Sequence, residues 1–557
     1  MAYVIGLDFG SLSCRGVLAD TSNGAIAAEK EAAYAHGVMT ESLPDGTPLS
    51  GSWCLQHPDD YLEVMDQIIP KLCSESGVDT EKIIGIAIDF TASTVIPLDD
   101  HFEPLCHTYG SRPHAWPKLW KHHGAQEQAE KLTELCRLYA PEYLSWYGGA
   151  ISCESLIAKV LQVFEEDPET FSAAHSFVEA MDYITGLLCD RPVFAGSAAV
   201  AKAMYSAEKG YPDTEFFERF HQKLKHFPQE KLIHRYEDHS VFFPGQRAGS
   251  LCPQMAERFG LKEGIAVSAP QMDAYAAMPG IGIAKPGTML MVIGTSTGIM
   301  LLSEERKSVE GVTACLPNTY YPGLWGYGSG QASVGDAFGW FVENCVPEEY
   351  RQAARSKNLT IHQYLSVLAA ELKPGESGLL ALDWLGGNRS CLGNPNLSGM
   401  VMGLTLQSKP EHVYRALLEA TAFGARIIVD AYREAGVKVD EIWICGGIAN
   451  KNSLMMQIYA DVLDMPLYIS RCTQAPALGS AIHAATAAGE GNIFEMVEQM
   501  GDRRCNVVSP NTLHHKIYDQ LFNEYKRLHD YFGKGENSVM ERLRRIAKQG
   551  GPEDEEK

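Results

Sequence analysis

Two stretches of this chain repeat one pattern, in which two apolar runs flank a short turn rich in Gly, Ser and Thr. The first covers residues 3–20 and turns at Gly10 and Ser11, and the second covers residues 289–302 and turns over 294–297. Each predicts a β-hairpin whose turn presents backbone N–H groups and hydroxyls, which suit a phosphate group. Because the hairpins begin nearly three hundred residues apart, they predict a duplicated domain that holds the phosphate chain of a nucleotide between its copies.

The length of 557 residues is too great for one hydrophobic core, so at least two large domains are expected. A cluster of Gly and Pro at residues 279–287 marks the predicted boundary, with one domain over 1–282 and the other over 283–557. The last residues, 550–557, are predicted to be frayed.

Strands and helices alternate in both halves, which predicts an α/β fold. Strands are expected over 3–7, 15–19, 83–89, 265–269, 441–445 and 467–470, and helices over 58–74, 126–138, 155–166, 176–188, 412–435, 453–463 and 477–488. The last of these helices is rich in Ala, which suits close packing.

Charge and cysteine content argue against several classes of function. A formal net charge of −23 makes nucleic acid and anionic membranes poor partners, but it allows a nucleotide, whose phosphates bind local backbone dipoles. The fourteen cysteines form no C-x-x-C pair, which favours reduced thiols over disulfides or zinc. The N-terminus shows no signal peptide and no run is long enough to span a bilayer, so a cytoplasmic protein is expected.

Asp8 ends the first strand of the first hairpin, beside its phosphate turn. A carboxylate in this position can hold a hydrated Mg²⁺ next to a phosphate chain. A plain hairpin with an Asx turn explains the same residues and is the favoured interpretation of this motif alone. The second turn, at 294–297, is what supports the nucleotide interpretation.

Two glycines, Gly446 and Gly447, follow a predicted strand and precede a predicted helix. They let the backbone approach a flat ligand closely, and Asn450 or Asn452 can hydrogen-bond the edge of an adenine. An ordinary strand-to-helix turn with an Asn cap fits the same residues equally well.

Asp273 follows an apolar strand and precedes small residues that can open a helix. It can cap the N-terminus of that helix. It can also be the base that accepts the hydroxyl proton when a phosphoryl group is transferred to an alcohol. The residues themselves favour neither role.

Further polar candidates lie in the first half of the chain. Ala92 and Ser93 follow a predicted strand, where α/β folds expose ligand contacts. The ammonium group of Lys202 can reach a sugar oxygen, although a solvated surface lysine is the more common explanation. His122 and His123 are adjacent and face different sides of a helix, which argues against a metal pair. Neither the H-E-x-x-H nor the P-loop motif occurs.

The order of these motifs resembles the FGGY carbohydrate kinases, a family of the actin/Hsp70/hexokinase superfamily. Further segments resemble the ribulokinase branch of that family, at residues 6–11, 56–61, 89–94, 119–123, 378–384, 387–390 and 474–482. The similarity runs from about Tyr3 to the C-terminal helices.

The resemblance implies two actin-like, RNase H-like α/β domains with an interdomain cleft, the sugar lying mainly on the N-terminal domain and ATP on the C-terminal one. It implies ATP and Mg²⁺ as cofactors, Asp273 as the general base and Asp8 as a residue that helps to hold Mg²⁺. Contacts to the nucleotide are implied for Gly10, Ser11, Ser13, Gly294, Thr295, Ser296, Thr297, Gly446, Gly447 and Asn450. Contacts to the sugar are implied for Ala92, Ser93 and Lys202. A homodimer is expected because dimers are common in the family.

Four positions depart from the family pattern. Gly328 stands where a glutamate of the sugar site is usual, Ser155 where a tryptophan is usual, Tyr275 where a histidine is usual, and Gly298 where a cysteine is usual. A lost carboxylate removes hydrogen bonds worth about 1.5–3 kcal/mol each, and Ser155 is expected to widen the pocket. The kinase core is therefore expected to be intact and the sugar site altered. Either the substrate differs from L-ribulose or other residues compensate.

The sequence thus predicts an ATP-dependent kinase of L-arabinose catabolism that phosphorylates the terminal hydroxyl of a ketopentose, L-ribulose first. The nearest alternative is the same chemistry on D-ribulose, xylulose, ribitol or erythrulose. An actin- or Hsp70-like ATPase with a conformational output is an alternative of another class, and a sugar-binding regulator without catalysis is a third.

Overall fold

The computed structural model describes residues 1–232, 241–312 and 314–549, which divide into two compact units. The first unit comprises Met1–Lys285, Cys315–Gly326 and Cys472–Arg503, and the remaining segments form the second. Each unit is therefore built from several stretches of sequence, and the boundary between 282 and 283 remains a prediction. The frayed end predicted at 550–557 lies outside the described residues.

The first unit is built on a sheet with the strand order β3-β2-β1-β4-β10-β9. These strands are β1 (Tyr3–Phe9), β2 (Ser13–Asp20), β3 (Ile26–Ala33), β4 (Ile83–Phe90), β9 (Arg247–Ser250) and β10 (Ala266–Ser268), and the short β11 (Gln271–Met272) also pairs with β4. The predicted first hairpin is confirmed, because β1 and β2 pair antiparallel around the turn. Strands β1, β10 and β11 all run parallel to β4.

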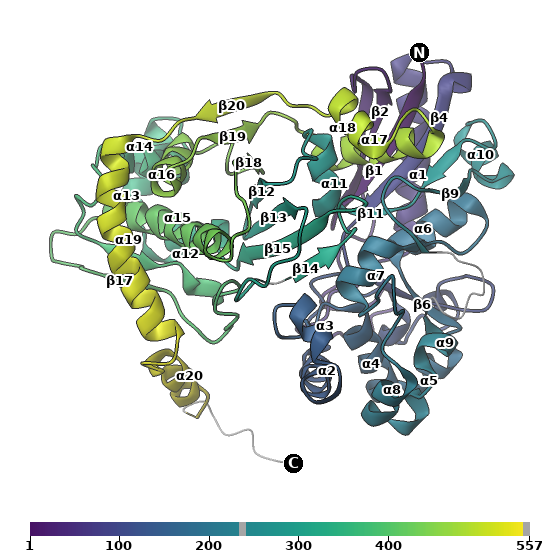
Figure 1. Ribbon diagram of the computed structural model, residues 1–557, viewed down its shortest axis with the longest axis horizontal. Helices are drawn as coiled ribbons and strands as arrows, with labels where there is room; N and C mark the ends of the chain where they lie inside the picture. The colour runs from purple at the N-terminus through teal and green to yellow at the C-terminus, as the bar shows by residue number, and fades with distance from the viewer. Residues whose placement is uncertain (233–240, 313, 550–557) are drawn as a thin grey trace. The chain divides into compact units, whose positions relative to one another are not determined.

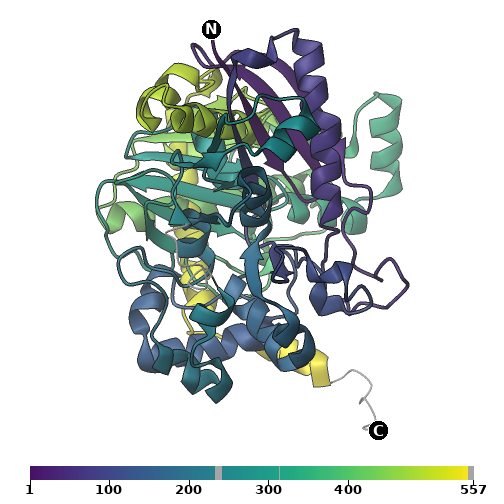
Figure 2. The same ribbon diagram turned by 90° about the vertical axis from the view of Figure 1, so that its right-hand side faces the viewer.

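Two helices cover opposite faces of this sheet, α1 (Asp59–Ser76) and α17 (Ala475–Ala488) (Figure 1). Side chains alternate between the faces of a strand, and the glycines show which face each helix takes. A Cβ added to Gly6 would meet α17, whereas one added to Gly16 would meet Ile68 of α1. Figure 2 shows α1 lying along these strands.

Helix α17 packs with its backbone almost directly on its neighbours, which explains its small residues. A Cβ on Gly6 would lie 1.9 Å from the carbonyl oxygen of Ala477. One on Gly479 would lie 1.8 Å from the carbonyl oxygen of Ala276, in α11 (Asp273–Gly280). The close packing predicted for this Ala-rich segment is therefore confirmed, and it depends on glycine at the points of contact.

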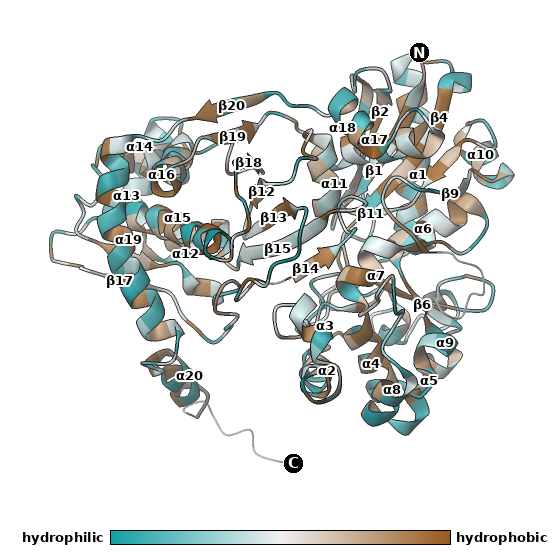
Figure 3. Ribbon diagram, in the orientation of Figure 1, coloured by the Kyte–Doolittle hydropathy of each residue, from teal (hydrophilic) through white to brown (hydrophobic). Residues whose placement is uncertain are grey.

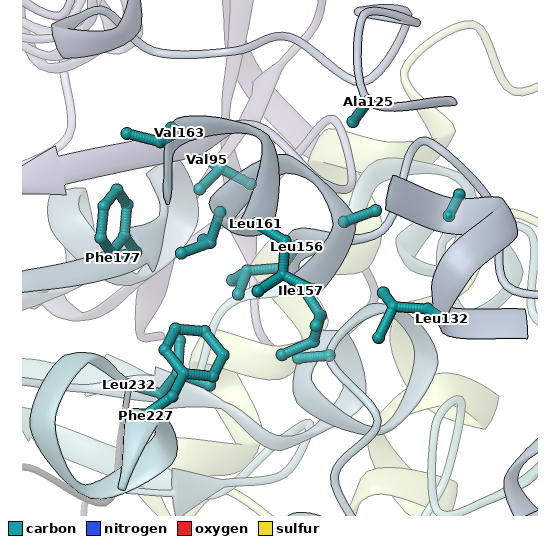
Figure 4. Close-up of a cluster of buried hydrophobic side chains, with 14 of the residues drawn as sticks. Val95, Ala125, Leu132, Leu156, Ile157, Leu161, Val163, Phe177, Phe227 and Leu232 are labelled. Atoms are coloured by element: carbon teal, nitrogen blue, oxygen red, sulfur yellow. The ribbon is translucent and has the colours of Figure 1, made fainter. Parts of the chain in front are cut away.

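The rest of the first unit is a mainly helical region around α4 (Leu156–Glu166), whose buried face forms a hydrophobic cluster with Leu132, Phe177 and Phe227 (Figure 4). Its other elements are α2 (Gln126–Tyr139), α3 (Pro141–Trp146), α5 (Pro168–Ala173), α6 (Ala180–Cys189), α7 (Gly196–Lys202), α8 (Thr214–Phe220) and α9 (Phe227–Lys231). Helices α10 (Pro253–Phe259) and α18 (Ile493–Met500) and strands β7 (Phe194–Ala195) and β8 (Val241–Phe242) also belong to this unit.

The helix predicted over 176–188 is wrong in its first turn. Residues Ser176–Glu179 form strand β6, which is buried throughout and pairs antiparallel with β5 (Val95–Leu98). Helix α6 begins only at Ala180. The pairing partner lies about eighty residues earlier in the chain, so local periodicity carries no signal for it.

Six strands of the second, seven-stranded sheet repeat the arrangement of the first, in the order β15-β13-β12-β18-β19-β20. The strands are β12 (Thr288–Ile293), β13 (Thr297–Ser303), β15 (Trp325–Gln331), β18 (Glu441–Cys445), β19 (Leu467–Ser470) and β20 (Cys505–Val508). The hairpin β12–β13 is antiparallel, and β12, β18 and β19 are parallel, as β1–β2 and β1, β4 and β10 are in the first unit. This common order confirms the predicted duplication and the two-domain α/β fold.

The second unit also contains helices. They are α12 (Gly335–Cys345), α13 (Glu348–Ser356), α14 (Ile361–Ala370), α15 (Pro410–Glu434), α16 (Ser453–Leu463), α19 (Thr512–Gly533) and α20 (Val539–Gln549), with a small hairpin of β16 (Leu380–Leu382) and β17 (Met400–Met402). Figure 3 shows brown, apolar central strands and a helix α19 that mixes apolar and polar residues. None of the described helices is long and apolar enough to cross a membrane.

The packing of α17 gives a stability prediction. Replacing Gly479 with Ala forces a methyl group against the Ala276 carbonyl oxygen, so we expect unfolding to become easier by about 1–3 kcal/mol. Gly339→Ala in α12 is the control, because a Cβ there meets nothing within 4 Å and alanine favours a helix by roughly 0.5–1 kcal/mol. Thermal unfolding of both variants measures the difference, and an unchanged midpoint for Gly479→Ala would contradict the described contact.

Candidate active site

Three carboxylates meet where three neighbouring strands of the first sheet end. Asp8 of β1 is the register partner of Asp89 of β4. Gln271 of β11 is also a partner of Asp89, and Asp273 follows two residues later. Since β1 and β11 run parallel to β4, the three side chains lie at the carboxyl edge of the sheet, where ligands bind in open α/β folds.

Asp89 is a residue that sequence reasoning missed. The segment 89–94 resembles the family pattern, but the sequence assigns no role to the carboxylate of Asp89. A signal was present, because both β1 and β4 end in Asp-Phe. Only the register shows that the two aspartates stand side by side.

Asp8 and Asp89 lie in a buried, acidic environment. Ser480 Oγ of α17 donates a hydrogen bond to Asp89 Oδ2 at 2.7 Å, whereas the buried Asp89 Oδ1 has no partner among the described residues. Burial raises the pKa of Asp89 well above its usual range, and the charges of Asp8 and Asp273 raise it further. Burial also raises the pKa of Asp8, and a side-chain hydrogen bond with Asp89 and the charge of the nearby Arg15 guanidinium oppose this rise. An acceptor oxygen without a donor in this position suits a proton or a cation.

Asp273 is the first residue of α11 and keeps part of its side chain open to solvent. Its Oδ1 accepts a hydrogen bond from the Ala274 N–H at 2.6 Å. Burial raises its pKa from 3.8 to about 7, the charge of Asp8 acts in the same direction, and the charge of Lys202 opposes both. Asp273 therefore accepts a hydrogen bond from the first turn of its own helix, and its pKa suits a base near neutral pH.

The turn of the first hairpin is held by side chains from outside it. Gly10 N–H donates to the Ser13 carbonyl oxygen at 3.0 Å. Trp120 Nε1 donates to Ser11 Oγ and Gln56 Nε2 donates to the Ser11 carbonyl oxygen, both at 3.0 Å. Trp120 and Gln56 are thus positioning residues for this turn, a role that the sequence did not indicate.

Ser93 lies in the turn after β4, beside the half-buried Ala92, and is itself fully buried. Its φ of 60° is left-handed, a conformation that costs a non-glycine residue about 1–2 kcal/mol. The buried ammonium group of Lys159 compensates by donating to the carbonyl oxygens of Ser93, at 2.5 Å, and Leu119, at 2.9 Å. Burial lowers the pKa of Lys159 to about 7, which the charge of Glu179 opposes.

Lys202 ends helix α7 and is not a solvated surface lysine. Only 25% of its side chain is exposed, and its Nζ lies 3.6 Å from Glu154 Oε2. The interpretation that spacing alone favoured is therefore wrong. Helix α7 packs against β11, and the charge of Lys202 lowers the pKa of Asp273.

In the second unit, the turn at Gly294–Thr297 is anchored to the start of α12. The Gly335 N–H donates to the Gly294 carbonyl oxygen at 3.0 Å, and the Val334 N–H donates to the Thr295 carbonyl oxygen at 2.7 Å. The buried hydroxyl of Thr297 has no partner within the described chain. Ser296, between Thr295 and Thr297, is half-exposed.

The glycine pair after β18 combines close packing with open space. Gly446 has a φ of 109°, and a Cβ there would lie 2.2 Å from the Ile293 carbonyl oxygen. A Cβ on Gly447 would meet nothing within 4 Å. Asn452 caps α16 by accepting from the Met455 N–H, whereas Asn450 contacts the carbonyl oxygen of Ser470 at 3.5 Å. The cap predicted for one of the two asparagines is therefore Asn452.

Comparison with known proteins decides the family. Residues 3–280 match the N-terminal domain of the FGGY family of carbohydrate kinases, and residues 289–488 match its C-terminal domain. The chain belongs to this family. It is therefore a carbohydrate kinase, as the sequence predicted.

Several relatives of this kinase are similar over nearly their whole length. A ribulokinase from Shouchella clausii is 43% identical over 552 residues, which is 98% of each chain. A ribulokinase from Bacillus licheniformis is 45% identical over 543 residues, covering 96% of this chain and 97% of the relative. The crystal structure of a xylulose kinase from Rhodospirillum rubrum has a TM-score of 0.78 at 22% identity, covering 95% of this chain and 98% of that one. This likeness shows the shared fold.

The structure explains some of the positions at which this kinase departs from the family pattern. Ser155 caps α4, its Oγ accepting from the Ala158 N–H at 3.2 Å. A Cβ on Gly328 would contact only Ala314 Cβ, at 3.6 Å, so no backbone constraint requires glycine there. The Tyr275 ring packs on Tyr320 with 4.2 Å between centroids. A Cβ on Gly298 would meet nothing within 4 Å.

A second group of metal-binding residue types lies in the first unit, where His36 is exposed, His57 half-buried and Asp60 buried. Ligand atoms of His36, His57 and Asp60 lie within 4.8 Å of one another, and His36 Nδ1 is 2.7 Å from Asp60 Oδ1. The two imidazole rings are stacked, with 4.1 Å between centroids and 17° between planes. Lone pairs lie in the plane of each ring, so stacked rings do not direct them at one ion, and the group does not form a metal centre as it stands.

The raised pKa of Asp273 predicts a pH-dependent stability. The folded state retains a proton up to about pH 7, whereas the unfolded state releases it near 3.8. Stability is therefore lost as the pH rises from about 4 to 7, and this loss is complete above that range. We expect Asp273→Asn to be more stable than the wild type at pH 8, by roughly 1–2 kcal/mol in the free energy of unfolding, and equally stable at pH 4. Thermal unfolding of both proteins, without nucleotide and with a chelator, measures this difference. A difference that is equal at both pH values would contradict the raised pKa.

Proposed function

We propose that this kinase transfers the γ-phosphoryl group of ATP to the terminal primary hydroxyl of a ketopentose, with L-ribulose as the first candidate. The observation that carries the proposal is Asp273, a partly open carboxylate whose pKa of about 7 suits proton transfer. The relatives named ribulokinase, which align over nearly the whole chain, support the choice of sugar.

Proton transfer follows from the environment of Asp273. Near neutral pH a large share of this carboxyl group is ionised, and its raised pKa makes it a stronger base than an ordinary aspartate. Its free oxygen accepts the proton of the sugar hydroxyl while the hydroxyl oxygen bonds to the γ-phosphorus and the bond to ADP breaks. The Ala274 N–H, which holds Oδ1, leaves the other oxygen for this role. Lys202 attracts the sugar through its ammonium group.

The residues of the first hairpin fit a magnesium ion. Asp8 supplies a carboxylate beside the turn at Gly10–Ser13, and the buried Asp89 Oδ1 lacks a hydrogen-bond donor. Oxygen ligands of this kind are those that Mg²⁺ prefers. When bound, Mg²⁺ neutralises charge on the β- and γ-phosphates. We propose that Asp8 would help to hold this ion beside the phosphates.

The nucleotide is assigned to the second unit. Its turn at Gly294–Thr297 offers backbone and hydroxyl groups for phosphates, and the open space beside Gly447 accommodates a flat adenine ring. The Asn450 amide is a candidate partner for the adenosine. Ser11 and Ser13 are proposed to contact the phosphates from the first hairpin, and Ala92 and Ser93 to border the sugar.

The cellular location and the oligomeric state of the kinase are also part of the proposal. An enzyme that consumes ATP and a free sugar is expected in the cytoplasm. A homodimer is expected from the family, and size-exclusion chromatography with light scattering measures it.

The base assignment predicts a selective loss of activity. Asp273→Asn removes the proton acceptor, so we expect kcat to fall by about 10²–10⁴-fold while the dissociation constant for ATP stays within twofold. Asp66→Asn is the matched control, because Asp66 pairs with Arg258 on the surface at 2.7 Å. Turnover of Asp273→Asn close to that of the wild type would refute the assignment.

A panel of acceptors tests the choice of sugar. ADP release is measured with L-ribulose, D-ribulose, xylulose, ribitol and erythrulose, and we expect the highest kcat/KM for L-ribulose. A higher value for another member would transfer the assignment to that sugar. ATP turnover that is indifferent to every sugar would favour an ATPase with a conformational output, and sugar binding without turnover would favour a regulator.

A further inference from the structure

A second carboxylate accompanies Lys202 at the edge of the candidate sugar site. Glu154 Oε2 lies 3.6 Å from Lys202 Nζ, and Glu154 Oε1 lies 3.8 Å from His123 Nε2. Only 24% of the Glu154 side chain is exposed, so this carboxylate is neither freely solvated nor sealed in the core.

The position of Glu154 is set by rigid neighbours. The residue immediately precedes Ser155, which caps α4, and its own N–H donates to Ser152 Oγ at 3.1 Å. One turn into the same helix, Lys159 holds the carbonyl oxygens of Ser93 and Leu119. Helix α4 therefore places Glu154 and ties down the turn after β4, which borders the same site.

Lys202 connects Glu154 to the proposed base. Its charge lowers the pKa of Asp273, and Glu154 lies beside Lys202 as an ion-pair partner. Lys202 is an obligate hydrogen-bond donor, and an ionised Glu154 is an obligate acceptor. Helix α7, which ends at Lys202, packs against β11, which ends one residue before Asp273, so the donor of this donor–acceptor pair is carried by an element adjacent to the proposed base.

We propose that Glu154 is a substrate-recognition residue. Together with Lys202 it binds two oxygen atoms that are carried by neighbouring carbon atoms of the acceptor. Lys202 donates to one oxygen, a carbonyl or a hydroxyl, and Glu154 accepts the proton of the adjacent hydroxyl in a hydrogen bond. The ligand class is an open-chain α-hydroxy ketone or vicinal diol. This inference rests on the proposed function, because it needs a sugar beside Asp273.

The first test is Glu154→Gln, which keeps the size of the side chain and removes its charge. Loss of a hydrogen bond to a charged group corresponds to about a 10- to 100-fold effect on binding. We therefore expect KM for the accepted ketose to rise by that factor and KM for ATP to stay within twofold. Glu218→Gln is the matched control, because Glu218 forms an exposed pair with Lys225 at 3.1 Å, and we expect it to change neither constant.

A second measurement separates direct recognition from an indirect role through Lys202. Analogues of the accepted sugar that each lack one hydroxyl are assayed with the wild type and with Glu154→Gln. If Glu154 binds a hydroxyl, the wild type has a KM for one analogue that is about 10- to 100-fold above its KM for the parent sugar. The Glu154→Gln variant then has similar KM values for that analogue and for the parent sugar. If every analogue keeps its full penalty in Glu154→Gln, direct recognition is refuted.

The outcomes also separate this inference from the proposed function. A wild type that phosphorylates a ketose, together with a Glu154→Gln variant of unchanged KM, refutes the role of Glu154 alone. A wild type that phosphorylates no sugar refutes both. Should Glu154→Gln fail to fold, as judged by circular dichroism and thermal unfolding, Glu154→Asp serves instead, and an unchanged KM for that shortened side chain also refutes the role.

Discussion

The first unit depends on one constraint, the contact of the α17 backbone with the sheet and with α11. Gly6 and Gly479 permit this contact, because a single methyl group at either would collide with a carbonyl oxygen. The helix brings Ser480 to Asp89 and closes the face on which Asp8 and Asp89 lie. A segment more than 380 residues away in the sequence thus creates the low-polarity surroundings that raise the pKa values at the site.

The candidate site concentrates unfavourable electrostatics. Burial of Asp8, Asp89 and Asp273 opposes their ionisation, and the charges of Asp8 and Asp273 raise the pKa of Asp89 further. Arg15 opposes this effect at Asp8, Ser480 at Asp89 and Lys202 at Asp273. The left-handed Ser93 adds backbone strain beside them. Such features lower stability and are typical of functional sites rather than of cores. Their presence at the edge of a parallel sheet is what makes the proposed proton transfer at Asp273 physically reasonable.

Sequence reasoning succeeded for local features and failed for those that depend on distant partners. The two hairpins, the strand at 441–445 and the Ala-rich helix were predicted from periodicity and turn residues, and the structure confirms them. The segment at 176–188 was assigned to helix alone, because its pairing with β5 leaves no local trace. The family resemblance predicts that Lys202 contacts the sugar, whereas spacing alone favoured a surface lysine, since spacing does not show the partner carboxylate of Glu154. Asp8 and Asp273 were found as separate motifs, while the register that places Asp89 beside Asp8 was not visible.

The sequence by itself determined the family, the duplicated α/β plan and the identity of the residues offered for catalysis, because these are written in short motifs and in their order along the chain. The tertiary structure alone decided which carboxylates stand together, how strongly each holds a proton, and that Glu154 accompanies Lys202. These properties arise from distances and burial between segments that are remote in sequence. Charges interact through space, and the surrounding protein sets their strength, so no local pattern of residues encodes them.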